Sequence, residues 1–187
     1  TWMSDSSIEG EYDIVLQLIN SNSEILYDEN GLVVSEADKR QESPIVRSDG
    51  SGGAFVVWGD KRNGSIGVYA QHIYDTGAIS LLDDGKEFFW GIDGNTVSSY
   101  ANKPSALYMG DNELVVSWTD QRYGQNLKNF GQKIYNNWLD SDVPDGFILS
   151  NADAQDYPVL ENLDNNIIHV FPDVSGEVKL KYQVLDQ

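Results

Sequence analysis

The sequence predicts an all-β protein built from repeated units of three to four antiparallel strands. Three observations predict it: an apolar segment ending in tryptophan recurs along the chain, a glutamine-bearing segment follows each copy, and prolines keep a steady spacing to the tryptophans. Short runs of Val, Ile, Tyr, Phe and Trp are bounded by Gly, Asn, Asp and Ser, and little repeats at helical spacing. Such runs are typical of strands.

The two best-matched copies start at Gly53 and Glu113, and each is an apolar strand that ends in Trp-x-Asp-x-Arg-x-Gly. The tryptophans are followed after 13 and 14 residues by Gln71 and Gln132. The motif supplies, in chain order, Trp58, Asp60, Arg62, Trp118, Asp120 and Arg122.

Two further copies flank this pair. Trp2 is followed 15 residues later by Gln17, and the apolar segment ending at Phe171 is followed by Gln183. The steps from one aromatic anchor to the next are 56, 60 and 53 residues, slightly above the periods of about 40 to 50 residues known for four-stranded propeller blades. We place the copies at about 1–43, 44–103, 104–157 and 158–187, with the first and last incomplete.

Prolines support this register independently. Pro44, Pro104 and Pro158 precede the aromatic anchors of their copies by 14, 14 and 13 residues.

Strands and turns follow from the same pattern. The turns at 49–53 and 110–112 contain Gly, Asp and Asn, which tolerate the positive φ angles of hairpins. We expect strands near 44–48, 54–59, 66–74 and 87–90 in the second copy, and near 105–109, 113–119, 127–135 and 146–149 in the third.

Three or four antiparallel strands per copy make the blade of a β-propeller. A β-sandwich does not require a repeated aromatic anchor in each unit, and a β-solenoid usually has a shorter period, so the propeller fits better. About three and a half copies fall short of the usual minimum of roughly four blades. We therefore expect the remainder of a longer chain, or a partner chain, to complete a larger ring.

The repeated motif is expected to build the blades. Each tryptophan can fill the gap between neighbouring blade faces. Each aspartate lies beside a turn, where it can accept backbone N–H bonds and pair with the motif arginine. The residues assigned to this structural set are Trp58, Asp60, Arg62, Trp118, Asp120, Arg122 and Phe171.

The glutamines stand in mid-strand among apolar neighbours, which is unfavourable for an amide unless both of its ends are bonded. We interpret them as residues that hydrogen-bond from blade to blade. The alternative is a polar ring around a channel that contacts a ligand. The set comprises Gln17, Gln71, Gln132 and Gln183.

The amino-acid composition narrows the range of molecules that the protein is expected to bind. The 187 residues include 30 acidic and 12 basic ones, for a net charge of -18. This charge repels phosphate backbones and anionic lipid, so we expect no nucleic-acid partner, and no apolar run is long enough for membrane insertion. The absence of cysteine excludes disulfides and thiolate metal sites. Carboxylates could attract calcium.

Calcium is the one cofactor that the sequence leaves open. Asp140, Asp142 and Asp145 precede Gly146 with a spacing that resembles a calcium loop, although Pro144 displaces the third carboxylate by one position. A plain surface turn is the alternative.

Other candidate chemistry is sparse. His72 and His169 are the only histidines, and neither has a Gly-x-Ser-x-Gly motif beside it, so they make a weak case for a catalytic triad or for zinc. With 30 acidic residues a carboxylate pair for glycoside hydrolysis stays open. Trp90 and Trp138 are the first candidates for a platform that binds sugar or peptide, with burial as the alternative for Trp90.

The segment 56–64, Val-Val-Trp-Gly-Asp-Lys-Arg-Asn-Gly, and the segment 68–71, Val-Tyr-Ala-Gln, resemble a known type of repeat. They are similar to the propeller-like repeats of large secreted and cell-surface bacterial proteins. The likeness covers nearly the whole chain, with Phe171 in place of tryptophan in the last copy. It implies an exported, multi-domain protein used for adhesion or display, and no catalytic residue can be carried over. A looser likeness to the sialidase propeller lacks most of the Asp-box pattern at 48–50.

Three functional hypotheses remain. The leading one is an extracellular or cell-surface propeller scaffold that binds protein or glycan through its loops. The second is a carbohydrate-active hydrolase, sialidase-like or another glycosidase, and the third is a structural spacer without a ligand. A hydrolase should gather several carboxylates and an arginine at one mouth of the central channel, whereas a scaffold should show only blade-building polar groups there.

Overall fold

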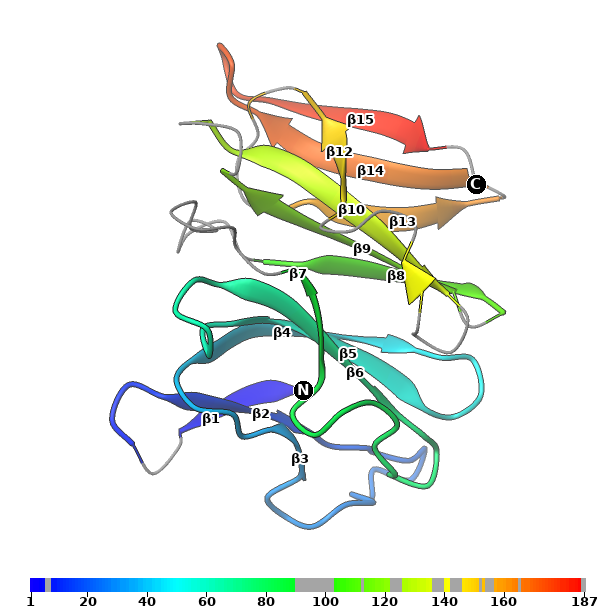
Figure 1. Ribbon diagram of the computed structural model, residues 1–187. Helices are drawn as coiled ribbons and strands as arrows, with labels where there is room; N and C mark the ends of the chain where they lie inside the picture. Colours follow the sequence, from blue (N-terminus) through cyan, green and yellow to red (C-terminus); the bar gives the residue numbers. More distant parts are fainter. Residues whose placement is uncertain are drawn as a thin grey trace.

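The chain forms four antiparallel sheets stacked in sequence order (Figure 1). The computed structural model describes residues 1–5, 8–89, 103–111, 113–121, 126–135, 140–141, 146–151, 153, 157–164 and 166–185. All regular structure in these segments is β-strand, and they contain no helix that could cross a membrane. The prediction of an all-β fold made of propeller blades is confirmed.

The sheets have three, four, five and three strands. In the second and fourth, sequence neighbours pair throughout, and in the third both β11 and β12 pair with β10. The first sheet holds β1 (Trp2–Asp5), β2 (Tyr12–Leu16) and β3 (Leu32–Ser35), and the second holds β4 (Gln41–Ser48), β5 (Ala54–Asp60), β6 (Gly67–Ile73) and β7 (Lys86–Phe89). The third holds β8 (Ser105–Gly110), β9 (Glu113–Asp120), β10 (Lys128–Tyr135), β11 (Asp140–Ser141) and β12 (Phe147–Ser150), and the fourth holds β13 (Val159–Leu163), β14 (Asn166–Asp173) and β15 (Lys179–Leu185).

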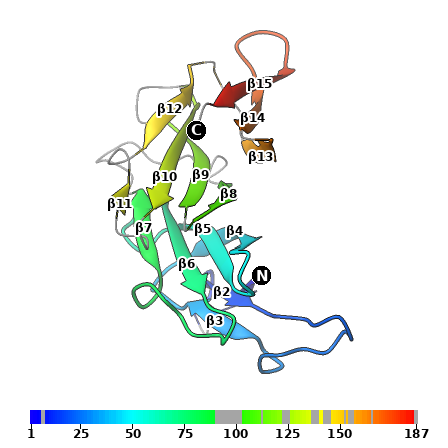
Figure 2. The same ribbon diagram turned by 90° about the vertical axis from the view of Figure 1, so that its right-hand side faces the viewer.

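The first strands of the second, third and fourth sheets form the inner side of the stack. β4 lies beside β8, and β8 lies beside β13. Figure 2 shows these three strands along one side of the stack, with β7, β11 and β12 on the other. Pro44 lies in β4, and Pro104 and Pro158 directly precede β8 and β13. Each of these three strands is the edge strand of its sheet, so one of its sides pairs with no other strand in the described part of the chain. A proline in or just before such a strand therefore costs no ladder hydrogen bond on that side.

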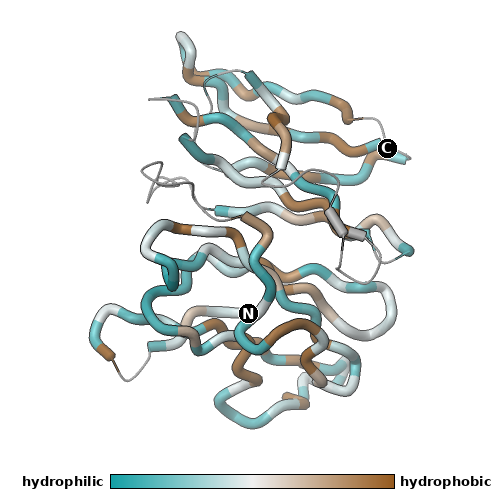
Figure 3. The backbone as a smooth tube through the Cα atoms, viewed as in Figure 1, coloured by the Kyte–Doolittle hydropathy of each residue, from teal (hydrophilic) through white to brown (hydrophobic). Residues whose placement is uncertain are grey.

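Trp58 and Trp118 fill the spaces between sheets, as predicted, whereas Trp2, the anchor of the first copy, is 40% exposed. Trp58 is fully buried in a cluster with Ile14 and Val34 of the first sheet. Trp118 is equally buried in a cluster with Phe55 and Phe89 of the second sheet, and its ring stacks on Phe89 with centroids 5.4 Å apart. Figure 3 shows apolar residues recurring along the strands in the middle of the stack. The repeated anchor therefore closes each blade against the one before it.

The aspartate of the motif binds the tryptophan and closes the following turn. Trp58 donates from Nε1 to Asp60 at 2.9 Å, and Trp118 makes the same 2.9 Å bond to Asp120. The backbone N–H of Arg62 donates to Asp60 at 2.9 Å, and its guanidinium forms a 2.6 Å ion pair with the same carboxylate. The predicted aspartate–arginine pair is thus confirmed in the second sheet, while Arg122 lies outside the described residues.

Arg62 also joins neighbouring blades. Its Nη2 donates to Ser35 Oγ of the first sheet at 3.3 Å and to the carbonyl oxygen of Asp84 at 2.7 Å. Its guanidinium carbon lies 4.2 Å from the centroid of the Tyr69 ring. Burial works to lower the pKa of Arg62, but the contact with Asp60 outweighs it and raises that pKa.

The fourth sheet replaces one part of the motif. Phe171 is buried like the tryptophans but has no N–H to donate. Asp173 instead accepts bonds from Lys181 of β15 and from Ser175, whose backbone N–H and hydroxyl lie 2.9 and 2.7 Å away. The hydrogen bond from Lys181 is the main reason that the pKa of Asp173 lies well below its usual range.

Gln17 and Gln71 bond within their own blade, so the prediction of blade-to-blade hydrogen bonds is wrong for these two residues. Gln71 accepts from the backbone N–H groups of His72 (3.0 Å) and Leu81 (2.9 Å) and donates to the carbonyl of Leu82 (2.9 Å). Because the amide is buried, it takes the nearest free backbone groups, which belong to the connection toward the fourth strand.

Gln17 repeats this arrangement in the first sheet. It accepts from the backbone N–H groups of Leu18 (3.1 Å) and Tyr27 (3.0 Å) and donates to the carbonyl of Asp28 (2.9 Å). Gln132 is buried at the equivalent point of β10, and Gln183 is half-buried on β15.

Three glycines complete the repeat and are not among the residues predicted from the sequence. Gly31, Gly85 and Gly146 have φ angles of 83°, 86° and 75°. A Cβ atom on Gly85 would lie 2.3 Å from the edge of the Trp58 ring, and one on Gly146 would lie 2.5 Å from Trp118. Their signal is an Asn-Gly or Asp-Gly pair 27 to 29 residues after each tryptophan. The glycine that follows the proposed calcium loop is therefore part of the blade.

Candidate functional site

A pocket lies where the three inner strands begin. We call it the axial pocket, and it is lined by residues 43–45, 47, 103–105 and 157–159. Its volume of about 370 Å³ falls within the roughly 300–1,000 Å³ of small-molecule sites. Each lining segment carries one of the repeated prolines. The three regularly spaced prolines therefore mark segments that are distant in the sequence but line the same pocket.

The backbone at this pocket is strained at two points. Ser43 and Tyr157, which precede two of the prolines, have φ angles of 55° and 78°. Residues other than glycine rarely adopt positive φ, and such strain is common at binding sites. Tyr157 is 57% exposed in spite of its large ring. The chain thus holds an aromatic side chain in solvent at the pocket.

Two cations face the axial pocket. Lys103 donates from Nζ to the hydroxyl of Tyr157, and the nitrogen lies 4.0 Å from the centroid of that ring. Arg47 donates from Nε to the carbonyl of Ala106 at 2.6 Å and from Nη1 to that of Val46 at 2.9 Å. In the part of the chain that the structure describes, neither cation forms an ion pair with a carboxylate.

The lining of the axial pocket contains an arginine but no Asp or Glu. Glycoside hydrolysis generally uses a pair of carboxyl groups about 5 to 9.5 Å apart on either side of the scissile bond. Such a pair is absent from the described lining. The chemistry available there is aromatic stacking, hydrogen bonding and attraction of negative charge.

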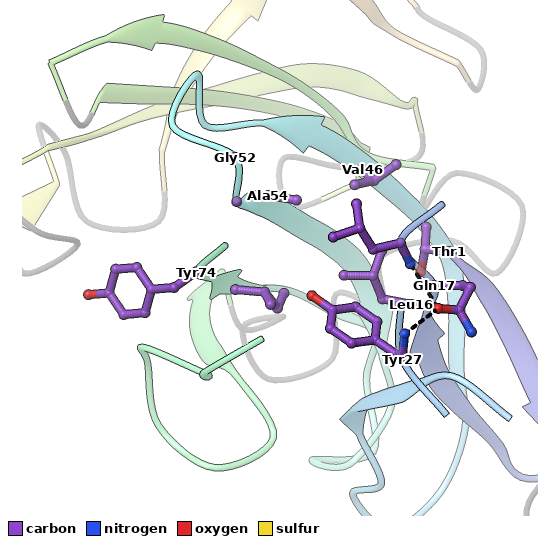
Figure 4. A pocket seen from close by; sticks show the side chains of 11 residues that line it. Thr1, Leu16, Gln17, Tyr27, Val46, Gly52, Ala54 and Tyr74 are labelled. Carbon is purple, nitrogen blue, oxygen red and sulfur yellow. Dashed lines mark hydrogen bonds between the residues drawn. The ribbon is translucent and has the colours of Figure 1, made fainter. Parts of the chain in front are cut away.

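A second, smaller hollow lies between the first two sheets (Figure 4). Its volume of about 150 Å³ is below the range of typical ligand sites. Figure 4 shows Leu16, Gln17 and Tyr27 gathered together, with the ring of Tyr74 pointing away from them. The bonds of Gln17 hold the backbone at Leu18 and Tyr27. This hollow is therefore a gap between blades rather than a site.

His72 is the only one of the two histidines with polar side-chain partners in the described part of the chain. Its Nε2 lies 2.9 Å from Asp49, and its Nδ1 lies 3.3 Å from the hydroxyl of Ser80. In a catalytic triad the serine bonds to Nε2 and the aspartate to Nδ1, which is the reverse of this arrangement. The serine contact is also long for a hydrogen bond to a hydroxyl.

The aspartate at this histidine has a structural task. Asp49 also accepts backbone N–H bonds from Ser51 and Gly53 at 2.7 and 2.9 Å, which closes the β4–β5 turn. Burial works to raise the pKa of Asp49, but the hydrogen bonds from His72 and these backbone groups outweigh it and lower that pKa. In the third sheet Lys133, at the position of His72, pairs with Glu113 at 2.8 Å. The pair ties neighbouring strands in both blades.

His169 is fully buried on β14, and neither ring nitrogen has a hydrogen-bond partner. Burial lowers its pKa from 6.5 to about 4. In the repeat it occupies the position of Val56 and Val116, which are also fully buried. Among the described residues no three His, Asp or Glu side chains lie close enough to hold a metal ion.

Several predicted site residues are not tested. Asp140 begins the short strand β11. Calcium at this loop and an aromatic platform remain predictions. The residues outside the described part of the chain are Trp90, Arg122, Trp138, Asp142 and Asp145.

Comparisons with known proteins establish the fold. No family model matches the chain, and a comparison with curated proteins finds no match. Among solved structures, an endo-arabinase from Bacteroides thetaiotaomicron aligns over 99% of this chain and 73% of its own, with a TM-score of 0.52 and 12% identity. An N-acetylgalactosamine deacetylase from F. plautii, in complex with blood group B trisaccharide, aligns over 91% and 57%, with a TM-score of 0.53 and 9% identity.

An α-L-arabinofuranosidase from Clostridium thermocellum aligns over 82% of this chain and 50% of its own, with a TM-score of 0.49 and 13% identity. The chain is a set of β-propeller blades. At such low identities the likeness shows the fold alone, and the chain spans between half and about three quarters of these proteins.

Proposed function

We propose that the chain is part of a carbohydrate-active β-propeller that holds a saccharide in the axial pocket. The observation that carries the proposal is the exposed ring of Tyr157 beside a pocket of about 370 Å³ at the start of the three inner strands. A sugar has an apolar C–H face that packs on aromatic and proline rings, and hydroxyls that bond to polar groups at the rim. Ser43 offers such a group.

The comparisons favour a carbohydrate-active protein over a plain scaffold. An endo-arabinase and a deacetylase bound to a trisaccharide both align with TM-scores above 0.5. This supports the hydrolase hypothesis more than the hypothesis of a scaffold for proteins. Glycoside hydrolysis is the second candidate function, because the described lining supplies a binding surface without the acidic pair that cleavage needs.

We also propose that a further blade covers the fourth sheet. Leu180, Tyr182 and Val184 alternate along β15 and are 79%, 72% and 48% exposed. Val68 and Ala70 hold the equivalent positions on β6, where the third sheet buries them. The remainder of a longer chain, or a partner chain, would cover this face and extend the ring. An exported, cell-surface location follows from the resemblance to secreted repeats and remains part of the proposal.

The test is a glycan array followed by calorimetric titration of the strongest binder. Tyr157→Ala removes the stacking ring and should weaken binding roughly threefold to tenfold, the range expected for one aromatic contact. Tyr74→Ala is the matched control, because Tyr74 is 48% exposed but lines the smaller hollow. Equal affinities of the two variants and the wild type would refute the site. Release of reducing ends from the bound glycan would establish hydrolysis.

A further inference from the structure

The cations of this acidic protein are distributed unevenly. Six of the eleven Lys and Arg side chains in the described segments pair with a carboxylate. Arg47 and Lys103 do not, and neither do Lys39 and Lys61, but Arg47 and Lys103 both line the axial pocket. The matched pairs are Arg40–Glu42 at 2.7 Å, Arg62–Asp60 at 2.6 Å, Lys128–Asp153 at 2.9 Å, Lys133–Glu113 at 2.8 Å, Lys179–Glu177 at 3.8 Å and Lys181–Asp173. In a chain of net charge -18, two cations without a carboxylate at one pocket mark a place for an anion.

We propose that the axial pocket recognises an acidic saccharide, a sugar unit that carries one carboxylate, through Lys103 and Arg47. This inference rests on the proposed function and names the substrate class of the same site. The two side chains come from different inner-strand segments, one before β8 and one on β4, and both line the pocket. A ligand between them would contact two blades at once.

The hydrogen-bonding capacity of both groups suits a carboxylate. Lys103 has three N–H donors, and its bond to Tyr157 uses one. Arg47 uses Nε and Nη1 for the carbonyls of Ala106 and Val46, which holds the planar guanidinium in place. The Nη2 end of the fork remains for a ligand, and charge-assisted bonds of this kind are about twice as strong as neutral ones.

The position of Tyr157 explains why a sugar acid fits better than a free anion. The Nζ of Lys103 lies 4.0 Å from the centroid of the tyrosine ring, so positive charge and the stacking surface adjoin each other. A sugar acid carries its carboxylate at the edge of a ring with an apolar face. One sugar unit can therefore stack on the tyrosine while its carboxylate reaches the lysine.

The surrounding charge restricts the ligand further. The net charge of -18 repels a polyanion at long range, and salt screens this repulsion. A single carboxylate at the cations meets local attraction instead. We therefore expect a short oligosaccharide with one carboxylate per acidic unit, and no binding of densely sulfated chains or nucleic acid.

The experiment compares digalacturonate with digalactose by calorimetric titration at 50 and 300 mM salt. Lys103→Gln is the decisive variant, because it removes the positive charge and keeps a hydrogen-bond donor. We expect the wild type to bind digalacturonate at least tenfold more tightly than digalactose, and Lys103→Gln to lose about tenfold for the acid alone. Lys61→Gln is the control, a cation outside the pocket lining, and should change neither affinity.

Arg47→Gln is a second variant whose fold must be checked by thermal melting, because Arg47 also bonds to β8. It should lose affinity for the acid in the same way. Equal binding of digalacturonate and digalactose, with no effect of Lys103→Gln, would overturn the acidic specificity and leave the proposed function standing. Binding of an acidic peptide in a Lys103-dependent manner, with no binding of either sugar, would overturn both.

Discussion

His169 gives the protein a pH-dependent stability whose size follows from its burial. The side chain is fully buried without hydrogen-bond partners, and its pKa falls from 6.5 in the unfolded chain to about 4 in the folded protein. The unfolded state therefore binds a proton between these two values while the folded state does not. Lowering the pH through this window stabilises the unfolded state, by up to about 3 kcal/mol at about 1.4 kcal/mol per pKa unit.

The substitution His169→Val tests this account, because valine occupies the same position at residues 56 and 116. The free energy of unfolding is measured by urea titration followed by tryptophan fluorescence. When the pH is lowered from 6.5 to 4, it should fall less in His169→Val than in the wild type, by up to about 3 kcal/mol. The difference between variant and wild type should be constant above pH 7. Ile168→Val controls for the loss of volume on the same strand and should keep the wild-type slope. An unchanged slope in His169→Val would refute the assignment.

Three further predictions concern the blades. Gly85→Ala should destabilise the protein by about 2 to 4 kcal/mol in urea unfolding, because the new Cβ would meet Trp58 at a positive φ. Gly64→Ala is the control, because Gly64 has a similar φ but open space around it, and it should cost only about 1 kcal/mol. Equal costs would contradict the packing argument. Gln71→Leu should cost about 2 to 3 kcal/mol in the same assay, because the backbone N–H groups of His72 and Leu81 and the carbonyl of Leu82 lose their partner. A neutral result would show that water replaces the amide. The exposed apolar face of β15 should also let two copies of the chain associate in sedimentation, and Leu180→Lys should reduce that association because it places a charge on the face. The same oligomeric state in wild type and variant would exclude that face from self-association.

Much of the fold can be predicted from the sequence because the repeated residues make the same packing contacts in successive blades. A tryptophan that recurs at the end of an apolar strand must find the same environment in each copy, and Trp58 and Trp118 do so between successive sheets. The Trp-x-Asp-x-Arg spacing also encodes a local contact, since Asp60 lies two residues from each of its partners. Contacts between residues this close in the sequence can be predicted without knowing the fold.

The glutamines show where this reasoning stops. The sequence reveals that Gln71 is a mid-strand amide in need of partners, but it does not reveal which backbone groups lie nearest. The partners are the connection 10 and 11 residues later, at Leu81 and Leu82. The glycines that face the tryptophans were hidden for another reason: Asp-Gly is common in turns, and only the three-dimensional contact shows why Gly85 has no side chain.

The axial pocket could not be predicted from the chain. Its lining comes from three short segments that begin at residues 43, 103 and 157, and only the order of the inner strands brings them together. The prolines were visible as a regular spacing, yet their location beside a common space depends on tertiary structure. Lys103 and Tyr157 lie 54 residues apart, and no local pattern joins them.

The most direct test of the account is hydrogen exchange of the backbone amides, measured by mass spectrometry with and without a saturating oligosaccharide. The ligand should slow exchange in peptides that cover 43–47, 103–105 and 157–159, the segments at the axial pocket. Exchange around residues 52–54, at the smaller hollow, should stay the same. Protection confined to 52–54, or protection elsewhere with none at the three inner strands, would contradict the claim that the saccharide binds on the axis.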